Sequence, residues 1–353
     1  MKSYVISILV CFYSAFSLAQ TMMFGDTSRL GRPFSKDPHV ITFKGKYLMY
    51  YSIPPKENST EVAGWGIGVA ESRNLNKWER VGEITPAAPY EAKGLCAPCA
   101  LVREDTVHLF YQTYGNGKKD AVCHAWSVDG INFVRNATNP VYVPTATWNC
   151  GRAIDAEVVF CRDKYYLYYA TRTPDYSTQV MGVAVAGKGT SFNRETWKDA
   201  CDRAILVPQY PWEGKCVEGP SVIPMGDWMF MFYAGAYNND PQQIGVARSK
   251  DGIHWEKMSN KRFLANGDAG SWNYCESGHP HIFKSPQGKT YLFCQVFIEY
   301  PDFLERRQAL FGKLNNMSMC QLVFSGIAQL IGTLTYCCIE IIINYNLKIR
   351  AVV

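Results

Sequence analysis

The stretch Asp37-Pro38-His39-Val40, followed by the aromatic run Tyr47-Leu48-Met49-Tyr50-Tyr51, sets a layout that the chain repeats. An acidic residue precedes an aromatic run at two further places: Asp155 before YYLYY at 165–169, and Glu218 before WMFMFY at 228–233. The acid and the last tyrosine are 14, 14 and 15 residues apart. Such regular spacing indicates a repeated unit, and aromatic runs favour strands. If the units close into a ring, the three carboxyl groups point at one axis.

A second strand rich in small residues follows each aromatic run. The four examples are GIGVAES at 66–72, VCHAWS at 122–127, MGVAVA at 181–186 and IGVARS at 244–249. Asp129-Gly130 and Asp251-Gly252 then provide hairpin turns. Two further units lack the acid: one contains Ala97-Pro98, and the last contains Gly278-His279-Pro280. Five units without helical periodicity predict an all-β protein, a five-bladed β-propeller whose last blade is atypical or incomplete.

The two ends of the chain differ from the repeats. Residues 1–19 combine Lys2, an apolar run and Ser17-Leu18-Ala19, which predicts a signal peptide and a secreted or periplasmic protein. Residues 20–312 form the predicted propeller domain. Residues 313–353 are an atypical apolar tail, in which 314–339 carry no charged side chain. This length could span a bilayer, but its polar residues favour a closing strand over a membrane segment.

The amino-acid composition indicates which classes of binding partner fit the chain. The net charge of +5 is spread without a Lys/Arg run, so the chain has no nucleic-acid footprint. Aromatic residues make up 14% of the chain, which suits both packed strands and a sugar-binding cleft. The lone Cys96-x-x-Cys99 pair lacks the second half of a zinc site, so the 13 cysteines are expected to be buried or in disulfides. The sequence leaves the oligomeric state open.

Three carboxyl groups on one axis suit the cleavage of a glycosidic bond. One carboxylic acid protonates the leaving oxygen, while a carboxylate activates water, and their separation distinguishes inversion from retention. A third carboxylate beside the acid helps it to hold its proton. Exposed tryptophans and an arginine near such a site are candidate sugar contacts, and we select Trp65, Arg152 and Trp212.

The ordered motifs resemble glycoside hydrolase family 43 and related five-bladed propeller families. The resemblance runs from about residue 36 to 295 and rests on Asp37-Pro38, Ala97-Pro98, Ile154-Asp155, Glu218-Gly219-Pro220 and Gly278-His279. It implies that 20–312 is a catalytic domain that cleaves O-glycosidic bonds in plant or algal poly- or oligosaccharides, with inversion. Asp37 would be the general base, Glu218 the general acid, and Asp155 the residue that modulates the pKa of the acid. No cofactor is required, although His279 matches a histidine that contacts substrate and lies near a calcium or sodium ion.

Several alternatives remain open, because Leu95-Cys96 and Cys99 depart from the family pattern around Ala97-Pro98. The propeller could bind carbohydrate without cleaving it. It could also act as an anhydrogalactosidase with His279 or His281 as the acid, or as a phosphorylase that uses Arg152, Arg172 and Arg248.

Each site residue also has a structural alternative. Asp37 could cap a turn, Asp155 could pair with Arg152, Glu218 could pair with Lys215, and His279 could be a hydrogen-bonded core residue. Glu157 is the rival of Asp155, because strand alternation places both on one face.

Overall fold

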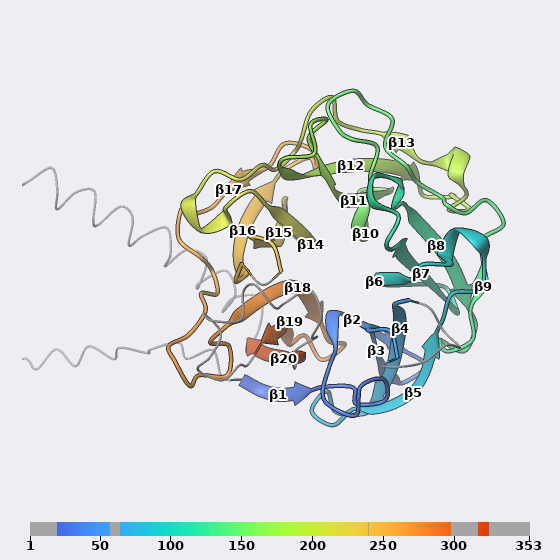
Figure 1. Cartoon of the computed structure of the whole chain (residues 1–353). Coiled ribbons are helices and arrows are strands. Elements are labelled where there is room, and N and C mark those ends of the chain that lie inside the picture. Colours follow the sequence, from blue (N-terminus) through green and yellow to red (C-terminus); the bar gives the residue numbers. More distant parts are fainter. Residues whose placement is uncertain (1–19, 57–63, 239, 298–316, 325–353) are drawn as a thin grey trace, which may run out of the picture.

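The computed structural model describes residues 20–56, 64–238, 240–297 and 317–324. Its strands form five four-stranded antiparallel sheets arranged around a central axis (Figure 1). The predicted all-β propeller is thereby confirmed. Four sheets each consist of strands that are consecutive in the chain. The first two are β2 (Lys36–Phe43), β3 (Lys46–Ile53), β4 (Gly66–Ser72) and β5 (Glu79–Ile84), and then β6 (Leu95–Arg103), β7 (Thr106–Thr113), β8 (Val122–Ser127) and β9 (Val134–Arg135). The next two are β10 (Ile154–Cys161), β11 (Lys164–Arg172), β12 (Gln179–Gly187) and β13 (Lys198–Asp199), and then β14 (Val217–Met225), β15 (Trp228–Gly235), β16 (Gln243–Ser249) and β17 (Glu256–Lys257).

The remaining sheet joins the two ends of the described chain. Its order is β18 (Glu276–Lys284), β19 (Thr290–Phe297), β20 (Met317–Phe324) and β1 (Gln20–Phe24). The outermost strand therefore comes from the beginning of the chain, which distinguishes this sheet from the other four. β20 falls within the segment 313–353, whose other residues lie outside the described residues, as does the predicted signal peptide 1–19. In the described part of the chain, no helix has the length and apolar character needed to cross a membrane.

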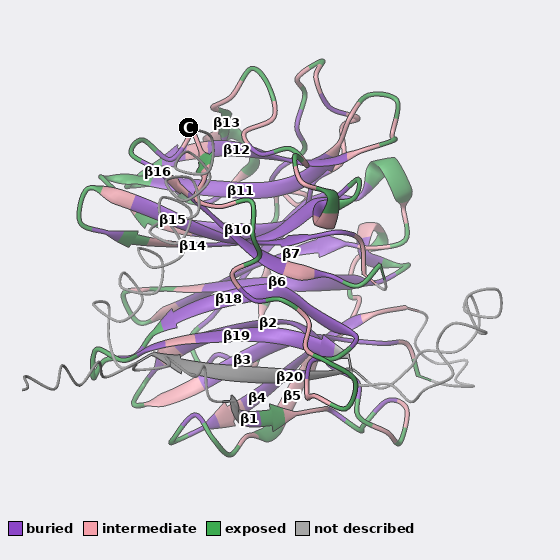
Figure 2. Ribbon diagram, turned by 90° about the vertical axis from the view of Figure 1, so that its left-hand side faces the viewer, coloured by how far each residue is buried: buried purple, intermediate pink, exposed green. Residues whose placement is uncertain are grey.

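Short 3-10 helices lie in the connections between strands. They are η1 (Pro89–Glu91), η2 (Gly117–Lys119), η3 (Arg194–Thr196) and η4 (Pro211–Glu213). Figure 2 shows the inner strands buried along most of their length, with exposed residues in the connecting loops. Apolar clusters fill the spaces between neighbouring sheets, as when Leu48 of one sheet and Leu109 of the next share a core. Each sheet thus buries its faces against its neighbours.

The small residues of the third strands make room for tyrosines of the second strands. A Cβ added to Gly68 would lie 2.3 Å from the ring of Tyr51, and one added to Gly182 would lie 2.4 Å from the ring of Tyr169. Such distances are far below van der Waals contact. The hydroxyl of Tyr51 then donates to the buried Asp26 at 2.8 Å. The small residues noted in the sequence are therefore explained by the packing of these tyrosine rings against the third strands.

Every inner strand carries one irregularity at the same place. The pairing register of β2, β6, β10, β14 and β18 shifts once, and the shift spans a residue with positive φ. These residues are Asp37 (φ 53°), Ala97 (49°), Asp155 (51°), Gly219 (57°) and His279 (38°). A bulge of this kind re-aims a side chain, and holding a non-glycine residue there costs about 1–3 kcal/mol. The fold accepts this strain at the positions that surround the axis.

Candidate active site

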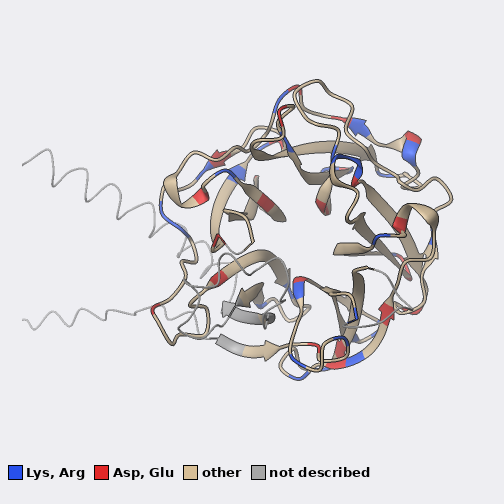
Figure 3. Cartoon of the chain, viewed as in Figure 1, with Lys and Arg blue, Asp and Glu red and all other residues tan. Residues whose placement is uncertain are grey.

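The structure brings together the three predicted acids and His279. The inner strands contact one another in the ring β2, β6, β10, β14, β18 and back to β2. The ring of His279 lies between two carboxyl groups, with Nδ1 3.1 Å from Oδ1 of Asp37 and Nε2 3.4 Å from Oε1 of Glu218. Ligating atoms of Asp155, Glu218 and His279 lie within 4.8 Å of one another. In Figure 3, the neighbouring inner strands β10 and β14 each carry an acidic segment near the axis.

Asp37 is held in its ionised form. Its Oδ2 accepts a hydrogen bond from Ser52 Oγ at 2.6 Å and lies 3.4 Å from Nζ of Lys36. Burial opposes ionisation, but Lys36 and then His279 outweigh it, so the pKa of Asp37 lies below its usual value. A carboxylate that is ionised at neutral pH can act as a base.

We expect Lys36→Met to move the acid limb of a pH–activity profile. Removing the ammonium group raises the pKa of Asp37, so more of the base is protonated at a given pH and the limb moves to higher pH. An opposite charge at this range is worth about one to three pH units. Lys36→Arg, which keeps the charge, and Lys118→Met, at an exposed position, should leave the limb in place. An unmoved limb in Lys36→Met would remove Lys36 from the control of Asp37.

Asp155 has the opposite electrostatic balance. Its backbone N–H donates to Gln112 Oε1 at 2.6 Å, while its Oδ2 is buried without a hydrogen-bond partner. Burial raises the pKa of Asp155 to about 7; His279 opposes this, and the nearby Glu218 and Asp37 add to it. Asp155 therefore exchanges its proton near neutrality, beside Glu218.

Buried glutamines hold the carboxylate of Glu218 in place, and no motif in the sequence predicted them. Gln242 donates to Oε1 of Glu218 at 2.5 Å, and Gln179 donates to Oε2. Gln295 joins the same network, since it donates to Gln242 Oε1 at 3.4 Å and accepts from the backbone N–H of Asp37 at 3.2 Å. A polar residue inside an apolar strand, such as Gln295 in YLFCQVF, was the available signal.

A second tier of polar side chains lies two residues further along the inner strands. Glu157 Oε2 lies 3.2 Å from Nε2 of His39, and Oε1 accepts from the backbone of Val222 at 3.0 Å. The ring centroid of His281 lies 3.8 Å from that of His39, with the rings tilted by 37°, and burial keeps the pKa of His281 well below its usual value. The structure thus separates Glu157 from Asp155 by tier and places His279, not His281, beside Asp37 and Glu218.

Little empty space remains along the axis between the two tiers of side chains. A cavity of about 30 Å³ is lined by residues of both tiers, including Asp37, His39, Asp155, Glu157 and His279. This is about the volume that one water molecule occupies in the liquid. Burial lowers the pKa of His279, but Asp37, Asp155 and Glu218 outweigh it and raise the pKa to about 9. Asp155, Glu218 and His279 lie close enough together to hold a metal ion. The calcium or sodium ion near His279 stays a prediction.

The predicted sugar contacts separate into two groups. Trp65 lies 5.2 Å from Nζ of Lys36 and therefore borders the acid cluster, as does Arg152 through Gln179. Trp212 differs, because it stacks on Tyr233 and donates to the Asn260 carbonyl at 3.1 Å. These contacts give Trp212 a structural role, and its contact with substrate stays a prediction.

The contacts of the site residues also test the structural roles that the sequence left open for them. Arg152 lies 3.5 Å from Asp120 and is not paired with Asp155. Among the described residues, no ion pair joins Lys215 to Glu218. Asp37 belongs to strand β2 and does not cap a turn. Arg248 pairs with Glu256 on an exposed outer strand, so it does not join Arg152 and Arg172.

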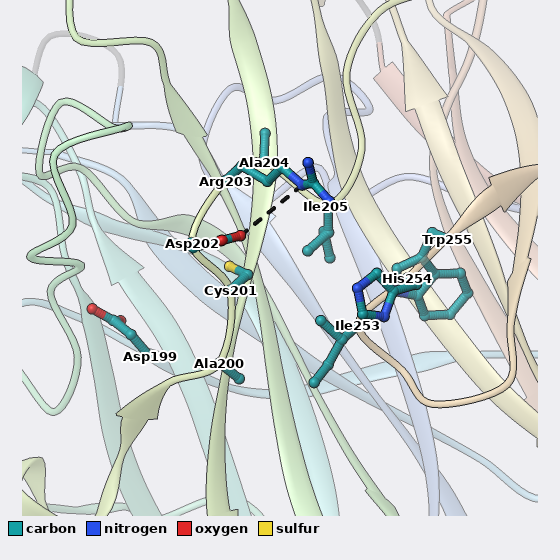
Figure 4. Close-up of a pocket in the computed structure, with 10 residues that line it drawn as sticks. All are labelled: Asp199, Ala200, Cys201, Asp202, Arg203, Ala204, Ile205, Ile253, His254 and Trp255. Carbon is teal, nitrogen blue, oxygen red and sulfur yellow. Dashed lines mark ion pairs between the residues drawn. The ribbon is translucent and has the colours of Figure 1, made fainter.

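A larger cavity of about 740 Å³ lies between the segments 199–205 and 253–255 (Figure 4). It shares no lining residue with the acid cluster. The ion pair between its lining residues Asp202 and Arg203, at 4.0 Å, is formed by side chains that are 96% and 81% exposed. Asp199 and His254 are held instead by residues outside the lining, Tyr142 and Asp251.

The fold and the acid cluster together define a class, the propellers whose inner strands gather carboxyl groups at one axis. The sequence profile of "Glycosyl hydrolases family 43" matches residues 30–309. The chain belongs to this family, which confirms the resemblance predicted from the motifs.

Relatives and solved structures agree with this membership. A curated "Sucrose-6-phosphate hydrolase" of Zymomonas mobilis subsp. mobilis is 24% identical over 241 residues, which cover 65% of this chain and 43% of the relative. The chain thus spans less than half the length of that relative. A thermostable family-43 glycoside hydrolase is 19% identical with a TM-score of 0.61, covering 82% of this chain and 88% of that one. An alpha-L-arabinofuranosidase from Lactobacillus brevis is 15% identical with a TM-score of 0.58, covering 82% and 90%. At these identities the two structures establish the fold.

Proposed function

We propose that the protein is a glycoside hydrolase that cleaves O-glycosidic bonds with Asp37 as general base and Glu218 as general acid. The observation that carries the proposal is the position of His279, whose ring separates Asp37 from Glu218 by contacts of 3.1 and 3.4 Å. Carboxyl groups held apart by a ring-sized gap suit inversion, which needs about 6.5–9.5 Å between them, against about 5–5.5 Å for retention.

The proposed reaction assigns one proton transfer to each of the two carboxyl groups. Glu218 donates its proton to the glycosidic oxygen while the bond from that oxygen to the anomeric carbon breaks. Water attacks the same carbon from the opposite face, and Asp37 accepts the proton of that water. The raised pKa of Asp155 keeps a proton beside Glu218 near neutral pH. Asp155 is therefore placed to modulate the acid and to help restore its proton after turnover.

The substrate is an oligo- or polysaccharide in this proposal. The related proteins carry the names sucrose-6-phosphate hydrolase and alpha-L-arabinofuranosidase, so five-membered sugar rings are reasonable first probes. Plant or algal glycans remain our preferred source of substrate, and export through the signal peptide at 1–19 would bring the enzyme to them. Trp65, partly exposed beside Lys36, offers an aromatic face for a sugar ring.

A screen tests the proposal directly. We expect turnover of at least one member of a panel of aryl glycosides and arabino-, xylo-, galacto- and agaro-oligosaccharides. Proton NMR of the first product should show the anomer opposite to that of the substrate. Retained configuration would contradict the assignment of Asp37 as a base. Binding of a panel member without any turnover would favour the alternative, a propeller that binds carbohydrate and does not cleave it.

A further inference from the structure

Two arginines lie next to the proposed acid and are joined to it by one side chain. Oε1 of Gln179 accepts from Arg152 at 3.5 Å and from Arg172 at 3.2 Å, while its amide nitrogen donates to Glu218. Arg172 ends β11 and Gln179 begins β12, so the hairpin between these strands fixes the arrangement. Tyr237 lies in the electrostatic range of both arginines and of Glu218.

Neither guanidinium is neutralised as a structural arginine usually is. Arg152 meets one carboxylate, that of Asp120 at 3.5 Å, and its buried Nε has no hydrogen-bond partner. Within the described part of the chain, Arg172 forms no ion pair and lies over the rings of Tyr176 and Tyr237, at 4.3 and 5.2 Å. Keeping such charges largely out of water is costly without a partner.

Arg135 shows what a structural pair looks like in the same molecule. Its Nε and Nη2 donate to the two oxygens of Glu91 at 2.9 and 3.3 Å, in the two-pronged geometry that suits a guanidinium and a carboxylate. Arg152 and Arg172 have no such partner, although the fold places them side by side. The difference indicates that the N–H groups of Arg152 and Arg172 bind a group that is not part of the protein chain.

We infer that Arg152 and Arg172 bind an oxyanion of the substrate, a carboxylate or a sulfate, next to Glu218. This inference rests on the proposed function, because it gives the substrate class for the same site: an acidic glycan. Guanidinium groups bind planar and tetrahedral oxyanions through paired hydrogen bonds, which lysine cannot reproduce. The aromatic rings under Arg172 keep its plane fixed and restrict the directions of its N–H groups.

Binding of free monosaccharides tests the inference without any cleavage, since these sugars have no glycosidic bond. We would titrate the wild-type protein with galacturonate, with galactose as the matched neutral sugar, and with inorganic sulfate and inorganic phosphate. We expect galacturonate to bind at least about tenfold more tightly than galactose, with an advantage that falls as salt rises. Arg152→Gln and Arg172→Gln should each reduce this advantage, because they weaken galacturonate binding more than galactose binding. Lys118→Gln, an exposed cation 5.2 Å from the Tyr176 ring, is the matched control and should retain it.

The remaining outcomes separate the alternatives. Equal binding of galacturonate and galactose, with no binding of sulfate, would overturn the inference. A preference that survives in the Arg152→Gln/Arg172→Gln double variant would also overturn it. If both arginines only brace Gln179, the variants would weaken the two sugars equally. Tight binding of phosphate, with sugar phosphates as products, would replace the inference by phosphorolysis. A protein that prefers galacturonate but hydrolyses no glycan would contradict the proposed function and leave the oxyanion site standing.

Discussion

Glu218→Gln should lower kcat by about 10²–10⁴-fold on natural oligosaccharides, the usual contribution of a general acid. Glutamine keeps the shape of the side chain, and its amide oxygen can still accept from one of Gln179 and Gln242, but it has no acidic proton to give to the leaving oxygen. The affinity for substrate should therefore change little. Steady-state kinetics and a binding titration of the same oligosaccharide would separate the two effects.

The leaving group makes this experiment specific for a general acid. An aryl glycoside with a strongly acidic phenol needs little protonation, so it should lose far less activity in Glu218→Gln than an oligosaccharide does. Asp37→Asn, which removes the base, should lower activity on both substrates equally. Glu256→Gln, at an exposed position of strand β17, makes the same chemical change away from the axis and should leave kcat unchanged. If Glu218→Gln loses the same factor on every leaving group, Glu218 is not the acid.

The sequence was sufficient to find the acids because a propeller repeats its strands with a fixed spacing. The distance from Asp37 to Tyr51 equals that from Asp155 to Tyr169, so equivalent residues could be aligned within one chain. Glu218 is one residue out of step, and the structure explains this: Gly219 holds the positive-φ position that Asp37 and Asp155 hold in their strands. Glu218 thus approaches the axis from the neighbouring position of its bulge.

Other features of the site depended on contacts between distant strands. The bond between Asp155 N–H and Gln112, and the one between Asp37 N–H and Gln295, join different sheets and leave no pattern in local sequence. The alternation that placed Glu157 and Asp155 on one face was correct, but alternation does not give depth along the axis. Trp212 was selected for its residue type, and its packing against Tyr233 could not be predicted from the local sequence.

The largest effect on stability is expected at an ion pair far from the chemistry. Glu213 in η4 is completely buried, and both of its oxygens contact Nζ of Lys257, at 2.6 and 2.7 Å. The hydroxyl of Tyr233 and the backbone N–H groups of Gln209 and Tyr210 also donate to it. The carboxylate therefore links the second and outermost strands of its sheet to the preceding connection. Glu91 with Tyr111 and Arg135 repeats the arrangement two sheets earlier.

Glu213→Ala should lower the free energy of unfolding by about 3–5 kcal/mol, because it leaves the charge of Lys257 buried without a partner. Burial already lowers the pKa of Lys257, with Glu213 opposing this effect, so loss of Glu213 lowers that pKa further. The penalty should consequently become smaller as the pH rises and Lys257 loses its proton. Urea unfolding at two pH values would measure both effects.

A double variant separates the buried charge from the lost hydrogen bonds. Glu213→Ala/Lys257→Met should recover part of the stability, since methionine fills the space of the lysine stem without its charge. Asp163→Ala breaks a pair with Lys188 whose side chains are 78% and 71% exposed, and it should cost less than about 1 kcal/mol. If Glu213→Ala were as mild as Asp163→Ala, the ion pair would not hold the sheet together. A double variant no more stable than Glu213→Ala would instead assign the loss to the bonds of Tyr233 and the η4 backbone.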